Sequence, residues 1–324
     1  MPHQNHKNMK KLLTIAIAMM AAAGAMAQSK VYFTKEITPE SLVKVYKALG
    51  VEPTGRVAVK ISTGEPGGHN YLKPTLIRNL VDEVKGTIVE CNTAYGGRRS
   101  TSAEHRKAIH EHGFDSIARV DIMDEEGNMN IPVKDTTHIK YDIVGSHLAN
   151  YDFMVNLAHF KGHAMGGFGG VLKNASIGVA SADGKAYIHT AGKVQSPKEL
   201  WQNLPAQDYF LESMAAAAQG VHDYMKGRVV YINVMNNMSV DCDCCEIAED
   251  PCMADMGILV STDPIAIDQA CIDLVYGCDD PGKAHFLERV ESRNGVHTIE
   301  AAAALGFRSR EDPPGKAAWF SRFP

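Results

Sequence analysis

Several features that would assign this 324-residue sequence to a specialised class are missing from it. No cluster of lysine and arginine is dense enough to attract nucleic acid, and the formal net charge is −5 at pH 7. The chain has no internal repeat, no low-complexity segment and no linker rich in proline or serine. With 45% hydrophobic and 22% charged residues, its composition is that of an ordinary globular protein. We therefore expect one continuous domain and no nucleic-acid partner.

Long apolar runs are also scarce, and the one near the N-terminus is typical of a secretory signal peptide. A pair of lysines at positions 10 and 11 precedes an apolar segment over 12–23, and the tripeptide AMA at 25–27 has the small-x-small pattern of a cleavage site. The segment is short for a membrane-spanning helix, and no cysteine follows the cleavage point to carry a lipid. We predict a signal peptide over 1–27 and a single exported, soluble domain over 28–324, in the periplasm or outside the cell. The alternative is an uncleaved anchor.

Short apolar runs rich in β-branched residues alternate with amphipathic segments along the rest of the chain. Five runs have the length of strands: 56–62, 86–92, 151–160, 227–235 and 256–261. Helices are predicted over 74–84, 102–114, 208–225 and 264–277. Strands that are apolar on both faces and separated by helices indicate a mainly parallel sheet covered by helices on both faces. The predicted fold class is therefore α/β, with ligands expected at the carboxyl ends of the strands.

The segment HFKGHAMGGFGGVLK, at the end of the third predicted strand, has the pattern of an anion pocket. In an extended chain its two histidines and first lysine project to one face, and the glycines allow the backbone to approach a ligand closely. The residues that follow resemble the start of a helix, whose amide groups attract anions. The predicted residues are His159, Lys161 and His163 as catalytic groups, and Gly166, Gly167, Gly169 and Lys173 as anion-binding groups. The alternative is a surface segment in which the glycines form a turn.

Two adjacent arginines follow the second predicted strand. Arg98 and Arg99 come after the turn sequence AYGG, where a pair of guanidinium groups could clamp a carboxylate or phosphate. A solvated surface pair is the equal alternative.

Four of the seven cysteines lie within the stretch SVDCDCCEIAEDPC, after the fourth predicted strand. Cys242, Cys244, Cys245 and Cys252 suit three chemistries. Disulfides are compatible with export, although bridges between such close cysteines are strained. Structural zinc usually takes paired CxxC hooks, which this spacing lacks. An iron–sulfur cluster is also held by thiolates, and a histidine or outside ligand can complete it if only three cysteines reach.

Three motifs together resemble a known family. HFKGHAMGGFGGVLKNASIGVAS, CDCC with the later DMGILVSTDPIAIDQACIDLV, and ECNTAYGGRRSTSAEHRKAIHEHGF are similar to the family named domain of unknown function 362, from about Val57 to about Tyr276. Its members are often labelled uncharacterised iron–sulfur centre proteins. The resemblance implies an iron–sulfur assignment without an established reaction. The ferredoxin module with CxxCxxC repeats, inserted in many members, is absent here, so only the CDCC-region cysteines remain as candidate ligands.

The resulting hypotheses belong to different classes. The first is an exported redox protein, an electron carrier or a reductase, with a [4Fe–4S] cluster on the cysteine loop beside the His/Lys pocket. The second is a non-catalytic metal-binding or ligand-binding protein with structural zinc or disulfides. The third, a metal-dependent racemase or isomerase, rests only on analogy, because nickel-dependent lactate racemases also combine histidines and lysines in an α/β fold. The expected partner is a small anion or a redox protein.

Overall fold

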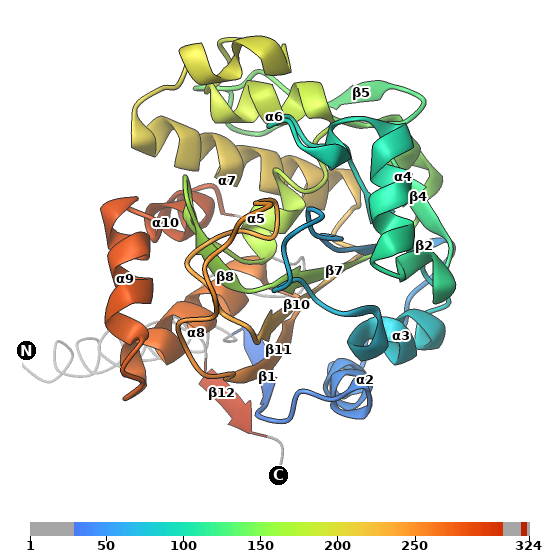
Figure 1. Ribbon diagram of the computed structural model, residues 1–324, viewed down its shortest axis with the longest axis vertical. Helices are drawn as coiled ribbons and strands as arrows, with labels where there is room; N and C mark the ends of the chain where they lie inside the picture. The colour runs from blue at the N-terminus through green and yellow to red at the C-terminus, as the bar shows by residue number, and fades with distance from the viewer. Residues whose placement is uncertain (1–28, 307–318, 323–324) are drawn as a thin grey trace, which may run out of the picture.

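The computed structural model describes residues 29–306 and 319–322, and the predicted signal peptide lies outside these ranges. Within them the chain forms an eight-stranded sheet flanked by helices (Figure 1). The strands of the sheet are β1 (Lys30–Thr34), β2 (Val57–Lys60), β3 (Thr87–Glu90), β4 (Val120–Ile122), β7 (Phe153–His159), β10 (Val229–Met235), β11 (Gly257–Ser261) and β12 (Trp319–Arg322). Two hairpins, β5 (Asn128–Ile131) with β6 (Asp142–Gly145) and β8 (Lys161–His163) with β9 (Gly167–Gly169), lie outside this sheet.

The sheet is mainly parallel, as the sequence predicts. Its order is β12-β1-β11-β10-β7-β2-β3-β4, and the pairs on either side of β11 are antiparallel while the others are parallel. All five predicted strands are present, within a few residues of their expected ends. The four parallel strands β10, β7, β2 and β3 therefore direct their carboxyl ends to the same edge of the sheet.

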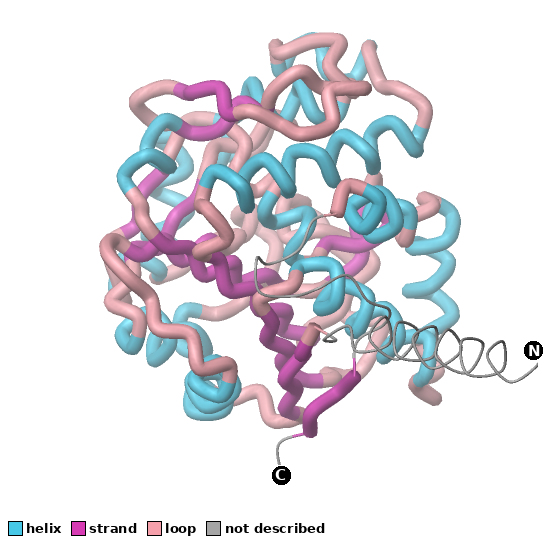
Figure 2. Tube along the Cα trace, turned by 180° about the vertical axis from the view of Figure 1, so that it is seen from behind, coloured by secondary structure: helices cyan, strands magenta, loops and turns pink. Residues whose placement is uncertain are grey.

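Helices cover both faces of the sheet. The described helices are α2 (Pro39–Ala48), α3 (Pro74–Glu83), α4 (Ser102–Glu111), α5 (Val171–Ala175), α6 (Ala182–His189), α7 (Gln207–Tyr224), α8 (Pro264–Gly277), α9 (Lys283–Ser292) and α10 (His297–Ala304). Alternate strand residues enter two separate cores: Val230 belongs to the core that includes residues of α2, α3 and α4, and Tyr231 to the core that includes residues of α5, α7 and α8. Figure 2 shows the strands running through the molecule with helices on either side. The predicted single α/β domain with a covered sheet is confirmed.

Local sequence explains where the helix after β11 begins. The side chain of Asp263 accepts hydrogen bonds from the amides of Ile265 and Ala266, and Pro264 occupies the first turn. This cap fixes the start of α8, which lies against β10 and β11 and supports the edge of the sheet that carries the cysteine loop.

Candidate metal centre

The four clustered cysteines lie in a long loop, 236–256, that joins the carboxyl end of β10 to β11. The segment that follows β7 and the loops that follow β2 and β3 surround it, because all four strands end at this edge. Candidate site residues that are far apart in the sequence are thereby brought together, as expected for a parallel sheet.

Asp243, between the first two cysteines, attaches the loop to the His/Lys segment. Its carboxylate oxygens lie 2.9 and 3.1 Å from His159 Nδ1, and Oδ2 lies 3.1 Å from Lys161 Nζ. All three residues are buried. Burial tends to raise the pKa of Asp243, but His159 and Lys161 outweigh it and lower that pKa to about 2. The basic side chains thus do converge, and the anion they bind is part of the chain.

Close backbone contacts hold the loop in place. A Cβ atom on Gly162 would lie 2.3 Å from the carbonyl oxygen of Val240, so only glycine allows this approach. The amide of Gly162 donates to Ser239 O at 2.8 Å, and the amide of Glu65, in the loop after β2, donates to Asp243 O at 2.7 Å. The position of the cysteines is therefore fixed from two sides.

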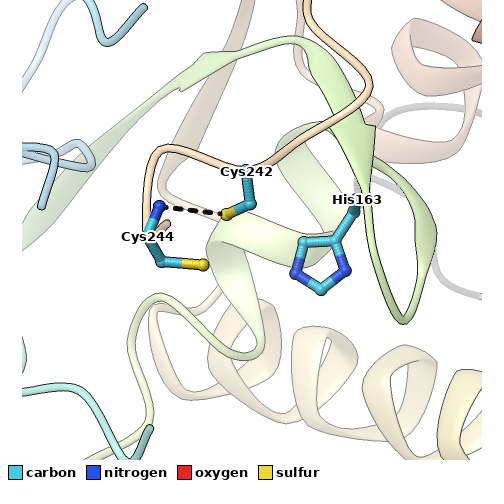
Figure 3. A group of neighbouring side chains, drawn as sticks. All are labelled: His163, Cys242 and Cys244. Atoms are coloured by element: carbon cyan, nitrogen blue, oxygen red, sulfur yellow. Dashed lines mark hydrogen bonds between the residues drawn. The ribbon is translucent and has the colours of Figure 1, made fainter. Parts of the chain in front are cut away.

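Cys242, Cys244 and His163 form a group that could bind a metal ion. The two sulfur atoms and one ring nitrogen all lie within 4.8 Å of one another. Figure 3 shows the two thiols and this side of the ring directed into the same space. Cys242 and His163 are buried, whereas Cys244 is partly exposed. Two thiols and an imidazole are suitable ligands for zinc and other thiophilic metals.

Positive groups surround these thiols. Lys173 Nζ lies 3.7 Å from Cys242 Sγ, and within the described residues no carboxylate lies at ion-pair distance from this ammonium group. A hydrogen bond from Cys244, together with Lys173 and His163, holds the pKa of Cys242 well below its ordinary value. Burial alone would lower the pKa of Lys173, but the two cysteines raise it. Cys242 is therefore stabilised as a thiolate, the form that binds metals.

The other two predicted ligands are placed differently. The backbone amide of Cys244 donates to Cys242 Sγ at 3.4 Å, and Cys245 lies close enough to Cys244 for the two thiols to shift each other's pKa, so Cys245 lies near the same site. Cys252 instead donates to Met238 O at 3.4 Å, and its pKa is raised by burial and, to a smaller extent, by Glu249 and Asp280, with no contribution from another cysteine. All seven cysteines of the chain are described, and each is a free thiol. The structure thus gathers three of the four predicted cysteines.

The two arginines have separate roles. Arg98 is exposed and makes a bidentate ion pair with Glu111, at 2.6 and 2.7 Å. Arg99 is buried between Glu65 and Glu90, at 3.1 and 3.0 Å, and lies near enough to Cys244 for that thiol to raise its pKa. Arg98 is therefore a surface residue, as the alternative interpretation predicted. Arg99 is a buried residue that lies near the thiols.

The glycines of the turn contact other parts of the protein. Gly166 donates its amide to His163, and a Cβ atom on Gly167 would lie 2.8 Å from Gly295 Cα. Gly169 pairs with Lys161 in the β8–β9 hairpin. The start of α5, predicted to attract an anion, donates the amides of Val171 and Leu172 to the carboxylate of Asp268 at 2.9 and 3.0 Å. A second predicted anion position is thus taken by a side chain of the protein itself.

Aromatic residues that the sequence did not single out border the thiols. Tyr95 is close enough to Cys242 and Cys244 that both raise its pKa, after the larger effect of burial. Its ring lies 5.2 Å from that of His189 and 6.2 Å from that of Trp201, which is 53% exposed. Asp243 was missed as well, although its position inside the CDCC motif was a usable signal.

Taken together, the fold and the site define an α/β protein with a cysteine-rich candidate metal centre at the carboxyl edge of a mainly parallel sheet. The chain belongs to the family described as domain of unknown function (DUF362), which matches residues 57–273 and so includes every residue of the centre. Within the described residues, no helix has the length and apolar character needed to cross a membrane.

Comparisons with other proteins give distant structural likenesses. The lactate racemase apoprotein from Thermoanaerobacterium thermosaccharolyticum has a TM-score of 0.43 at 15% identity, over 77% of this chain and 57% of that one. A structural-genomics protein from Thermotoga maritima has a TM-score of 0.41 at 14% identity, over 84% and 59%. This chain thus spans less than two thirds of either structure, and likeness at this level carries no argument about activity. No curated protein matches the chain.

Proposed function

We propose that the protein is an exported redox protein, an electron carrier or a reductase, whose [4Fe–4S] cluster is held by Cys242, Cys244 and Cys245. The observation that carries this proposal is the gathering of three cysteines in one turn, with Lys173 Nζ 3.7 Å from Cys242 Sγ. Export follows from the signal-peptide pattern in the sequence.

The chemistry of the donor set fits such a cluster. Iron–sulfur clusters are bound by cysteine thiolates, and their net charge is usually negative. Cys242 to Cys245 form a turn in which the amide of Cys245 donates to Cys242 O at 2.9 Å, so this short segment brings three thiols near one another, as a cluster of several irons requires. Lys173 supplies a positive charge beside Cys242, with no carboxylate at ion-pair distance in the described part of the chain.

When bound, the cluster would supply one-electron transfer. The residues of the chain would do the rest. Asp243 holds the cysteine loop against His159 and Lys161, while Lys173 stabilises negative charge at Cys242. Cys244 and Cys245 are partly exposed, so this side of the centre faces the surface, where a redox partner or a small anion could approach.

A second candidate is a single metal ion, zinc above all, in a protein that binds metal without redox chemistry. The observation in its favour is that the ligand atoms of Cys242, Cys244 and His163 lie within 4.8 Å of one another. One ion draws its ligands close together, and thiols combined with imidazole are a donor set that zinc commonly takes.

Metal and sulfide analysis separates the two candidates. The protein is purified without oxygen, and its iron, acid-labile sulfide and zinc are measured per chain together with the visible absorption spectrum. Iron and sulfide in similar amounts, with broad absorption that bleaches on reduction, support the redox proposal. Zinc without sulfide supports the second candidate, and a protein that binds neither metal after anaerobic reconstitution contradicts both.

A further inference from the structure

The imidazole of His163 is held in one orientation by the backbone of the turn that follows it. The amides of Met165 and Gly166 lie 3.2 and 2.8 Å from its Nδ1 atom. An amide N–H can only donate, so Nδ1 must accept both hydrogen bonds and carries no proton. In the neutral ring the proton is therefore on Nε2.

The protonated nitrogen is the one that faces the cysteines. Figure 3 shows the ring nitrogen far from the backbone attachment directed toward Cys242 and Cys244, and a nitrogen of this ring lies within 4.8 Å of the Cys242 sulfur. The Nε2–H group is thus directed toward the Cys242 sulfur, to which it can donate a hydrogen bond.

This arrangement is the reverse of that found around metal-bound histidines. A ligating imidazole normally donates its other N–H to a carboxylate, a carbonyl or water. If Nε2 of His163 bound a metal, Nδ1 would carry the proton and would face two amide N–H groups. The turn cannot easily rotate to avoid this, because Gly167 is packed against the backbone of Val290 and Gly295.

We propose that His163 donates a hydrogen bond to the metal-bound sulfur of Cys242 and is not a ligand, so that one coordination position is left for an exogenous carboxylate beside Lys173. This inference rests on the proposed metal centre, but it holds for a cluster or a single ion alike. His163 is then a positioning residue, and the ligands from the chain are cysteine thiolates. The ammonium group of Lys173, 3.7 Å from Cys242 Sγ, selects a negatively charged ligand for the remaining position.

The test uses the full mature chain loaded with cadmium-113 and labelled with nitrogen-15 in histidine. Cadmium binds thiolates without redox chemistry, so the result does not depend on whether iron or zinc is the native metal. We expect the NMR spectrum of His163 to show a protonated Nε2 and no coupling to cadmium. Coupling between cadmium and a His163 nitrogen would overturn the inference while leaving a metal centre in place. Failure to bind any thiophilic metal would instead contradict the metal centre itself.

Variants test the two parts of the inference separately. His163→Gln keeps a side-chain N–H donor, so it should retain cadmium, whereas His163→Ala should bind it more weakly, by about 10- to 100-fold. Equal loss in both variants would contradict a donor role.

Acetate is the probe for the open position. Titration with acetate should shift the cadmium resonance of the parent, and Lys173→Gln should weaken this effect at least about tenfold, because a charge-assisted contact is lost. The matched control is Lys44→Gln, which changes an exposed lysine of α2 and should behave as the parent. A cadmium resonance in the parent that no concentration of acetate changes would contradict the open position.

Discussion

Asp243 Oδ2 lies 3.1 Å from Lys161 Nζ, and both side chains are buried. The two residues are on different segments, so this ion pair joins the cysteine loop to the strand β8. His159 contacts the same carboxylate, which means that two of the three residues predicted to be catalytic hold the loop that carries the candidate metal centre.

Removal of the Asp243 charge should destabilise the protein strongly. Asp243→Asn leaves Lys161 and His159 buried without a countercharge, and breaking a buried pair in this way costs about 3–5 kcal/mol. The free energy of unfolding is measured by urea denaturation of the metal-free protein, so that lost metal binding does not contribute. Asp250→Asn removes a carboxylate whose side chain is 90% exposed and should change stability by less than about 0.5 kcal/mol. Equal effects of the two substitutions would contradict this role for Asp243.

A methyl group at Gly162 should displace the cysteine loop. The added Cβ would meet the Val240 carbonyl at 2.3 Å, and because this neighbour is backbone the clash cannot be relieved by a rotamer change. We expect Gly162→Ala to cost about 1–3 kcal/mol of unfolding free energy. Gly277→Ala is the control, because no heavy atom lies within 4 Å of its added Cβ. If both variants are as stable as the parent, the loop is not held as closely as described.

Asp142 should make stability depend on pH. Asp142 is fully buried, and within the described residues neither of its carboxylate oxygens has a partner at hydrogen-bonding geometry. Burial raises its pKa to about 7. The unfolded chain releases this proton near pH 3.9, so the unfolded state is favoured progressively as the pH rises from about 4 to 7. Asp142→Asn avoids this loss. Its free energy of unfolding, minus that of the parent, should therefore increase by about 2–4 kcal/mol between pH 4 and pH 8. A stability difference that is the same at both pH values would show that Asp142 has an ordinary pKa.

The five predicted strands and the four predicted helices could be found because their patterns are local. The apolar runs identify β2, β3, β7, β10 and β11, and Asp263-Pro264 marks the start of α8. The short strands β4 and β12 and the antiparallel position of β1 beside β11 were not predicted, since they depend on pairing between distant segments.

The site was predicted less completely, for a physical reason. The sequence shows that His159 and Lys161 suit an anion, but not that the anion is Asp243, more than eighty residues further along. The start of α5 is a similar case, because its amides bind Asp268. Spacing alone also cannot show which cysteine is separate, since the loop that carries Cys252 turns toward Met238.

The most direct test of the metal centre compares cysteine variants of the anaerobically prepared protein. Cys242→Ser and Cys244→Ser should lose iron, sulfide and visible absorption, because both thiols belong to the gathered group. Cys252→Ser, which alters a thiol bonded to a backbone carbonyl instead, should keep the metal content of the parent. Loss of metal from Cys252→Ser together with retention in Cys242→Ser would contradict the account.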